Sequence, residues 1–220
     1  MPRINLNVPF MQKDLAKELG ARWDFANKVW YVPDGVDPAP FAHWLPPEAA
    51  PYADTSQSPG FDIRAMHYFI VQSHTHCWRC KGLTRVFSFL LPPEHEAYEP
   101  ADDDGPGYWF SPGGVCIVSM IDALPPTVLA HMKRYTRNYR QAYSRTAGTR
   151  YFLNHCEHCH AAQGDFYMHN EPGGAFCPVD TLDAQHMLLY PINEPFEGSG
   201  GCGLHSEDYF IEVMQIRRAR

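Results

Sequence analysis

Two Cys-x-x-Cys pairs stand far apart in the chain, the first in "HTHCWRC" at 74–80 and the second in "NHCEHCH" at 154–160. Runs typical of extended structure flank each pair. Zinc prefers four tetrahedral ligands, and a Cys-x-x-Cys turn brings two thiolates to one ion without strain. Two such pairs complete the coordination shell. The pattern predicts a structural Zn²⁺ ion held by Cys77, Cys80, Cys156 and Cys159.

The distance between the pairs limits how such a site can be built. Between Cys80 and Cys156 lie 75 residues, whereas a minimal zinc ribbon separates its pairs by roughly 15–20. We therefore expect a ribbon with a long insertion whose two ends the metal ties together. A link across a long loop stabilises the folded chain, so metal binding would be part of folding.

Other chemistry fits these cysteines less well. A redox Cys-x-x-Cys places its first thiol at a helix N-terminus, but a strand-like run follows "CWRC". The His155–Glu157 segment resembles the H-x-E of zinc deaminases, which needs a separate Cys pair further along; here the two motifs overlap. Five nearby histidines could be exposed or supporting residues, or could replace a cysteine at the metal or build a second site: His74, His76, His155, His158 and His160.

Three further cysteines lie outside the two pairs. Cys116 sits in the apolar run "GGVCIVSMI" and is expected in the core. Cys177 and Cys202 flank glycine-rich segments. A reactive Cys202–His205 dyad is an alternative, but "EGSGGCGLH" matches no defined nucleophile geometry.

Composition narrows the class of protein. The 220 residues are 45% hydrophobic and 14% aromatic, which supplies enough apolar surface for a core. No apolar run approaches the roughly 18–20 residues of a membrane span, and the first residues lack the features of a secretory signal. These observations lead us to expect a cytoplasmic protein without a membrane partner. The formal net charge of −7 argues against a general polyanion binder.

The first fifty residues read as a small unit of their own. Ile4, Leu6 and Val8 alternate with polar residues, as in a strand. "QKDLAKELG" is typical of a short helix with Leu15 and Leu19 on one face and Gly20 at its end. "KVWYV" predicts a second strand and "APFAHWL" a second helix, with the tryptophans in the core. The pattern predicts a β-α-β-α module.

Residues 6–45 also resemble a known family. The segments "NVPF", "KDLAKELGARWD", "KVWYVP" and "FAHWL" are similar to the small uncharacterised module, a domain of unknown function, found ahead of conjugative-plasmid DNA primases and anti-restriction proteins. The resemblance implies association with proteins that handle DNA and implies no activity of the module itself. Residues 65–220 resemble a zinc-ribbon protein of unknown function.

The domain organisation follows from these segments. We expect an α+β protein with a small β-α-β-α module at 1–46, a Pro/Ala/Ser-rich linker at 47–64, and a zinc-ribbon-based domain with a long helix-containing insertion at 65–220. The last strand of this domain is expected in "DYFIEVMQI".

The segment 124–155 carries charge of one sign. It contains no acidic residue and six basic ones. As a helix over 126–145 it would place tyrosines on a buried face and Lys133, Arg137 and Arg140 on the opposite, exposed face. That face could bind nucleic-acid phosphate, could pair with the acidic cluster Glu94–Asp104, or could be merely solvated.

The sequence thus favours a zinc-binding, non-enzymatic binding or adaptor protein, with nucleic acid as one candidate partner in a mobile-element or DNA-processing setting. One alternative is a protein–protein interaction module that uses the acidic loop and the ribbon surface. Another is an enzyme that uses Cys202 or the histidines. The sequence identifies no catalytic residue and no small-molecule substrate.

Overall fold

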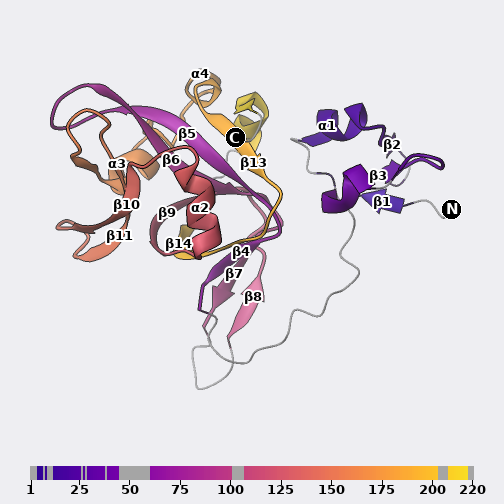
Figure 1. Cartoon of the computed structure of the whole chain (residues 1–220), viewed down its shortest axis with the longest axis horizontal. Helices are drawn as coiled ribbons and strands as arrows, with labels where there is room; N and C mark the ends of the chain where they lie inside the picture. Colours follow the sequence, from indigo (N-terminus) through magenta and orange to yellow (C-terminus); the bar gives the residue numbers. More distant parts are fainter. Residues whose placement is uncertain are drawn as a thin grey trace. The chain divides into compact units, whose positions relative to one another are not determined.

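A computed structural model of the chain describes residues 4–6, 8, 12–25, 27, 29–37, 39–44, 60–100, 107–202 and 208–217. The chain divides into two compact units, Met1–Asp54 and Thr55–Arg220, which we treat separately (Figure 1). The expected linker at 47–64 falls outside the described residues as far as residue 59, as do Asp102–Asp104 of the acidic cluster. The expected domain boundaries therefore stay a prediction.

The smaller unit is a three-stranded antiparallel sheet with one short α-helix and a 3-10 helix. The strands are β1 (Ile4–Leu6), β2 (Arg22–Asp24) and β3 (Val29–Val32), in the order β1-β3-β2. Helix α1 spans Lys13–Glu18 and the 3-10 helix η2 spans Ala39–Trp44. Gly20 takes a φ of 103°, a left-handed conformation that glycine adopts without strain and that ends the helix.

Aromatic rings from η2 form much of the core of this unit. Phe41 and Trp44 are almost fully buried, together with Leu6 and Val32. The Trp44 indole N–H donates a hydrogen bond to the buried Gln12 side chain. The face of α1 turned to this core is Ala16, whereas Leu15 and Leu19 are 46% and 38% exposed. The expected apolar face of the helix was therefore wrong.

The predicted β-α-β-α order of the module is also wrong. An additional strand, β2, follows α1, and the chain closes with a 3-10 helix in place of a second α-helix. Trp23 of "ARWD" on β2 lies opposite Trp30 on the paired strand β3, and the two ring centroids are 5.5 Å apart. Such a cross-strand aromatic pair stabilises a hairpin, which explains why the segment after Gly20 is a strand.

The larger unit is built on a nine-stranded sheet in the order β15-β13-β5-β6-β9-β14-β4-β7-β8. All neighbours are antiparallel except β13 and β15. The strands are β4 (Ile63–Ala65), β5 (Tyr68–His76), β6 (Leu83–Leu91), β7 (Glu96–Glu99), β8 (Tyr108–Phe110), β9 (Cys116–Ala123), β13 (Leu188–Ile192), β14 (Phe196–Cys202) and β15 (Gln215–Ile216).

A second, three-stranded sheet lies beside the first and has the order β10-β11-β12. Its strands are β10 (Tyr139–Ser144), β11 (Thr149–His155) and β12 (Ala162–Gln163). The helices are α2 (Pro126–Lys133), α3 (Asp165–His169), α4 (Thr181–Gln185) and the 3-10 helix η3 (Asp208–Val213). In Figure 1, the β10–β11 hairpin projects from the same end of the unit as the tip of β5 and β6.

One apolar core joins the large sheet, α2 and the second sheet. Val128 and Met132 of α2 pack with Phe89 of β6, Tyr139 of β10 and Phe196 of β14 in a single buried cluster. The Tyr139 and Phe152 rings stack at 5.7 Å, so the β10–β11 hairpin contributes its base to this core. The hairpin is therefore anchored at one end only, and its outer part is exposed.

The predicted α+β fold with a zinc-ribbon-based domain is corrected by this architecture. Strand residues make up 44% of the structure and helical residues 18%. The two Cys pairs therefore lie in a protein that is built mainly of β-sheet. The expected helix over 126–145 ends at Lys133. Tyr139 and Tyr143 are four residues apart, a spacing that shares one face of a helix and also one face of a strand. Their segment, "YRQAYS", forms β10.

Two smaller expectations were also wrong. An extended run was expected on either side of each Cys pair, but after the second pair only the two-residue strand β12 is present, and the following "GDFYMH" contains the helix α3. "DYFIEVMQI" forms η3 followed by the short strand β15. Within the described residues, no helix is both long enough and apolar enough to span a membrane.

Candidate metal centre and the strands that it joins

The two Cys-x-x-Cys turns have the same backbone geometry. In the first, Cys77 N–H donates to Gly82 C=O at 2.9 Å and Lys81 N–H donates to Cys77 C=O at 2.9 Å. In the second, Cys156 N–H donates to Ala161 C=O at 2.9 Å, and His160 N–H to Cys156 C=O at 3.0 Å. The fourth residue after the leading cysteine has a positive φ in each turn, 62° at Lys81 and 59° at His160. Two segments of unrelated sequence thus form the same turn.

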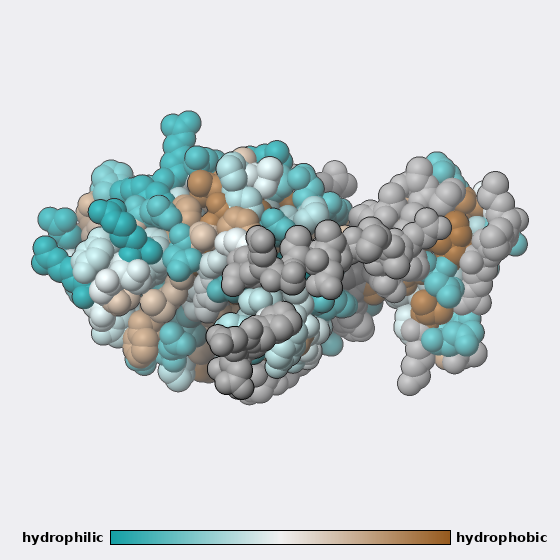
Figure 2. All heavy atoms as spheres, turned by 90° about the horizontal axis from the view of Figure 1, so that it is seen from below, coloured by the Kyte–Doolittle hydropathy of each residue, from teal (hydrophilic) through white to brown (hydrophobic). Residues whose placement is uncertain are grey.

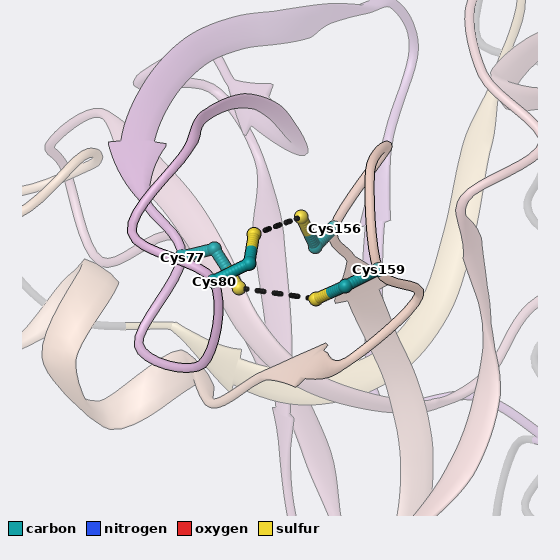
Figure 3. Close-up of side chains that lie close together, drawn as sticks. All are labelled: Cys77, Cys80, Cys156 and Cys159. Carbon is teal, nitrogen blue, oxygen red and sulfur yellow. Dashed lines mark hydrogen bonds between the residues drawn. The ribbon is translucent and has the colours of Figure 1, made fainter.

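The turns face each other so that their four sulfur atoms converge. The first turn joins β5 to β6, and the second follows β11 directly; Figure 3 shows the sulfurs pointing inward from these two loops. The Sγ atoms of Cys77 and Cys159 are 3.6 Å apart, as are those of Cys80 and Cys156. In a tetrahedral zinc site with Zn–S bonds of about 2.3 Å, neighbouring sulfurs lie about 3.8 Å apart. The four cysteines could therefore hold one metal ion.

Backbone N–H groups favour the thiolate form of the leading cysteines. Burial opposes ionisation, but hydrogen bonds from the N–H groups of Cys80 and Arg79 outweigh it and lower the pKa of the Cys77 thiol to about 6. Burial likewise opposes ionisation of the Cys156 thiol. Hydrogen bonds from the N–H groups of Cys159 and His158 lower the pKa of this thiol. Metal ions bind thiolates in preference to thiols, so this environment suits coordination.

The nearby histidines form hydrogen bonds with backbone carbonyls or lie outside the group of converging sulfurs. His158 Nε2 donates to Leu83 C=O at 2.8 Å, and His76 Nδ1 to Lys81 C=O at 3.2 Å. His155 Nδ1 lies 3.0 Å from Leu153 C=O and 3.2 Å from Asn138 C=O. Burial lowers the pKa of His155, and the nearby Arg140 charge lowers it further. Among the described residues, the converging metal-binding atoms are cysteine sulfurs, and neither His74 nor His160 is part of the group.

Close contacts between the two turns support the cluster. Trp78 Nε1–H of the first turn donates to Ala162 C=O at 2.8 Å, and Gln163 Nε2 lies 3.4 Å from Cys77 Sγ. A Cβ atom at Gly82 would come within 2.9 Å of the His158 ring, which explains a glycine there. The turns are therefore packed against each other as well as bringing their sulfurs together.

An ion pair next to the sulfurs joins β6 to the second turn. Arg85 Nε and Nη2 donate to Glu157 Oε1 at 2.9 and 2.5 Å. The Arg85 backbone N–H donates to Glu157 Oε2 at 3.1 Å, and Glu157 N–H donates to Thr84 Oγ1 at 3.0 Å. The Arg85 guanidinium is the main cause of the lowered pKa of the Glu157 carboxyl. Glu157, which the sequence suggested as part of an H-x-E motif, thus pairs with a neighbouring strand.

Asn154 joins the two sheets a few residues before the second turn. Its Oδ1 accepts from Phe87 N–H at 2.7 Å and its Nδ2 donates to Phe87 C=O at 2.9 Å. Asn154 is 2% exposed and Phe87 is 1% exposed. The side-chain amide therefore takes the place of a neighbouring strand for one residue of β6. Asn154 could not be singled out from the sequence, because a lone asparagine in an apolar strand has no distinguishing local pattern.

The basic residues expected on one helix lie on three different elements. Lys133 ends α2, Arg137 lies in the turn after it, and Arg140 lies on β10. With three further arginines they form what we call the basic segment, whose side chains are all exposed: Lys133, Arg134, Arg137, Arg140, Arg145 and Arg150. In the part of the chain that the structure describes, none of the six forms an ion pair with a carboxylate.

The acidic cluster considered as their internal partner pairs differently where it is described. Glu96 forms a 2.6 Å ion pair with Arg64 of the neighbouring strand β4. The Arg64 guanidinium also lies 4.0 Å above the Trp109 ring of β8. The structure therefore connects Glu96 with the β4–β7–β8 end of the large sheet.

The remaining cysteines include an unexpected pair. Cys116 is buried, as expected, but it is bonded to Cys202 in a disulfide. The His95 ring lies 3.3 Å from Cys202 Sγ, whereas the His205 of the suggested dyad is outside the described residues. Cys177 is a free, half-buried thiol, and burial raises its pKa. No sequence pattern connected His95, Cys116 and Cys202, because three distant segments supply them.

A buried carboxyl group lies at the start of α3. Asp165, at the start of α3, is 4% exposed, and burial raises its pKa to about 7 although the Met120 N–H donates to its Oδ2 at 2.7 Å. Its Oδ1 has no hydrogen-bond partner among the described residues. The folded protein therefore retains a proton on Asp165 at pH values where an exposed aspartate is ionised.

Comparison with known proteins finds similarities for the residues of the smaller unit. Residues 3–46 match the family model described as Domain of unknown function (DUF5710). Over 42 residues the chain is 67% identical to a DNA primase TraC of Escherichia coli, covering 19% of this chain and 4% of that protein. A second Escherichia coli DNA primase TraC is 62% identical over 39 residues, 18% of this chain and 3% of the other. No solved structure matches.

These matches confirm the resemblance of the N-terminal residues to the module of DNA primases. The chain spans less than a twentieth of the length of the relatives it matches. The matches named here do not support the resemblance of residues 65–220 to zinc-ribbon proteins, and the larger unit must be interpreted from its own geometry.

Proposed function

We propose that the four cysteines bind a structural zinc ion that clamps the β10–β11 hairpin onto the β5–β6 hairpin. The spacing of the sulfurs supports zinc, because both 3.6 Å pairs are close to the edge of a zinc–thiolate tetrahedron. A fourth protein sulfur leaves no coordination position for substrate, so the ion has a structural role. Cys77 and Cys156 are fully buried, as expected of a site formed during folding.

Metal content of the purified protein tests the clamp. We expect one equivalent of zinc in this group, absent from Cys156→Ser, and tetrahedral tetrathiolate spectra after replacement by Co²⁺. Cys177→Ser is the matched control, since that free thiol lies outside the group, and it should retain the metal. Folded wild-type protein whose four cysteines all react rapidly with a thiol reagent in the presence of zinc would refute the clamp.

We further propose that the basic segment binds the phosphate backbone of nucleic acid. The observation that carries this proposal is six exposed cationic side chains, none paired with a carboxylate among the described residues, on a stretch of 32 residues without an acid. Such a local excess attracts a polyanion even on a protein of net negative charge. Figure 2 shows hydrophilic side chains gathered at the left end of the larger unit, the end where β10 and β11 lie.

The hairpin has a suitable shape for this contact. Arg145 lies at its tip, and Arg150 on β11 is the cross-strand neighbour of Tyr143, which is 56% exposed. A two-stranded ribbon fits the major groove of DNA, and an exposed tyrosine between arginines can stack on an unpaired base. The similarity of the first unit to part of two DNA primases supports a DNA-processing setting, in line with the module of conjugative plasmids.

Fluorescence anisotropy with labelled single-stranded and double-stranded DNA tests nucleic-acid binding. If the segment contacts about three phosphates, the logarithm of the association constant should fall with the logarithm of salt concentration with a slope of about −2 to −3. The combined variant Arg140→Glu, Arg145→Glu and Arg150→Glu should bind at least tenfold more weakly. Arg217→Glu alters an exposed arginine elsewhere in the same unit and should bind as the wild type does.

Two results would refute the nucleic-acid proposal. One is the absence of salt-dependent binding to either form of DNA and to RNA. The other is wild-type affinity in the triple charge-reversal variant, provided that its zinc content and circular dichroism are unchanged.

A second candidate function is protein–protein recognition at the edge of the large sheet that β8 forms. Among the described strands, β8 is the last one at this edge, and its one partner is β7. Tyr108 and Phe110 on this strand are 60% and 38% exposed, and their rings lie 6.1 Å apart. An exposed edge strand with aromatic side chains can accept an extended peptide as an additional strand. A protein partner that binds wild type but not Tyr108→Lys would support this candidate.

A further inference from the structure

A second group of metal-binding side chains lies apart from the four-cysteine cluster. His95 comes from the turn between β6 and β7, Cys116 begins β9, and Cys202 ends β14. The Sγ atoms and one ring nitrogen of this group lie within 4.8 Å of one another. His95 and Cys116 are each 1% exposed, and Cys202 is half-buried. Three segments distant in sequence thus bring two sulfurs and an imidazole together.

The His95 ring is fixed in one orientation. Its Nδ1 lies 2.7 Å from Pro92 C=O, and the backbone N–H of His95 donates to the same carbonyl at 3.0 Å. A carbonyl only accepts hydrogen bonds, so Nδ1 carries the hydrogen and, in the neutral ring, Nε2 presents its lone pair. That lone pair faces Cys202 Sγ at 3.3 Å. Metal-binding histidines are held in the same way, by a hydrogen bond from the other ring nitrogen to a carbonyl.

In the disulfide state, this lone pair has no hydrogen-bond donor among the described residues. A disulfide sulfur has no hydrogen to donate, so a buried acceptor nitrogen faces an atom that cannot pair with it. Burial of an unpaired polar atom is unfavourable. A thiol hydrogen or a metal ion in place of the S–S bond would satisfy the nitrogen. The arrangement therefore suits a second state in which Cys116 and Cys202 are reduced.

We propose that His95, Cys116 and Cys202 form a second zinc site, which is assembled when the Cys116–Cys202 disulfide is reduced. Two thiolates and one imidazole are a ligand set that zinc accepts, and a water molecule completes the tetrahedron. The Cα atoms of the two cysteines are 5.6 Å apart on neighbouring strands, so little backbone movement separates the states. The site shares no residue with the four-cysteine group.

The two states are connected by balanced steps. Two thiols of an external reductant transfer two electrons and two protons to the disulfide, which yields two cysteine thiols and leaves the reductant as its own disulfide. Zinc then displaces the two thiol protons and bonds to both sulfurs and to His95 Nε2. Because a sulfur in the S–S bond is no longer a thiolate, the disulfide and the zinc complex exclude each other.

Zinc stoichiometry in the two redox states tests the proposal. Whole protein is reduced with an excess of a phosphine without oxygen, loaded with zinc, freed of unbound metal and analysed for zinc per chain. We expect two equivalents in the reduced protein and one after oxidation to the disulfide. His95→Ala and Cys202→Ser should each hold one equivalent when reduced, whereas Cys177→Ser should hold two. One equivalent in reduced wild type, or two in both site variants, would overturn the proposal.

A measurement on wild type alone covers the case in which the variants do not fold. Reduced protein is treated with iodoacetamide with and without zinc, and alkylation is measured peptide by peptide. Zinc should slow alkylation of Cys202 at least tenfold, whereas magnesium should not, and Cys177 should react equally in all conditions. Unchanged alkylation of Cys202, or a disulfide that resists the phosphine in the folded protein, would overturn the second site. The four-cysteine peptides, read in the same experiment, report separately on the proposed clamp.

Discussion

Replacement of Asn154 by alanine should destabilise the larger unit far more than its single side chain suggests. The ladder between β6 and β9 begins at Phe89, so the peptide groups of Phe87 on that side have no strand partner and rely on Asn154. Asn154→Ala removes both hydrogen bonds and leaves a buried N–H and a buried C=O without a partner. The strand β6 is central in the sheet, where water does not readily replace them.

The magnitude follows from these two groups. Each buried polar group that loses its partner costs about 1–3 kcal/mol, so the free energy of unfolding should fall by about 2–6 kcal/mol. Domains of this size have about 5–15 kcal/mol in total. The matched control is Gln141→Ala on β10, which loses one exposed hydrogen bond to Asp122 C=O and should cost about 0.5 kcal/mol or less.

Native-state hydrogen exchange in urea, read by mass spectrometry, is the suitable assay because it reports on each unit separately. The peptides that contain β6 and β11 give the free energy of opening for the larger unit, with zinc and reductant held constant. A loss below about 1 kcal/mol in Asn154→Ala would refute the reasoning, since it would mean that the Phe87 peptide groups find other partners. Equal losses in Asn154→Ala and Gln141→Ala would refute it too.

Three further outcomes are expected. A strong zinc chelator should lower the free energy of unfolding of the larger unit by more than about 2.7 kcal/mol, the value for a ligand at a hundred times its dissociation constant, and should leave exchange in α1 and β3 unchanged. Glu157→Gln should cost only about 1 kcal/mol by urea denaturation, because the Arg85 side chain is 42% exposed and solvent screens the pair; a loss above about 3 kcal/mol would contradict this. Burial raises the pKa of Asp165 from 3.8 to about 7, so the folded state holds a proton that the unfolded chain releases, and the stability contributed by this group falls as the pH rises from about 4 to 7. The stability gained by Asp165→Asn relative to wild type should therefore grow by about 2–3 kcal/mol between pH 5 and pH 8, and a difference that is constant with pH would contradict the raised pKa.

Local patterns made part of this fold predictable. The strands on either side of the first Cys pair are present, β5 and β6, because alternating β-branched and aromatic residues form extended structure whatever their partners. The turn residues between them are equally local. The order of the nine strands is not, because β13 and β14 reach their places through contacts between residues more than 70 positions apart, such as Leu189 with Val71 and Cys202 with Val118.

The basic segment shows how one spacing can support two structures. Tyrosines at positions 135, 139 and 143 repeat every four residues, which places them on one side of a helix and on one side of a strand alike. The chain ends α2 at Lys133, and the Thr136 hydroxyl then accepts a hydrogen bond from Asn138 N–H in a turn. Side-chain hydrogen bonds of this kind compete with the helix. The charge of the segment was predictable from sequence, but its arrangement on a hairpin was not.

The β10–β11 hairpin connects the two proposals, the zinc clamp and nucleic-acid binding by the basic segment. Within the described residues, strands β10, β11 and β12 form a sheet that has no ladder to the nine-stranded sheet. Beyond the apolar base at Tyr139 and Phe152, the described contacts that orient the hairpin include the Gln141 bond to Asp122 C=O, the Asn154 amide, the Arg85–Glu157 pair and the converging sulfurs. The Cys pair at 156 and 159 directly follows β11, so a metal bound to the four sulfurs would fix the strand that carries Arg150. Loss of the ion would free the hairpin to move about its base and spread its arginines over many positions. Charges held at fixed spacing bind a regular polyanion more tightly than charges that must first be ordered, so zinc removal should weaken nucleic-acid binding without touching a cationic residue.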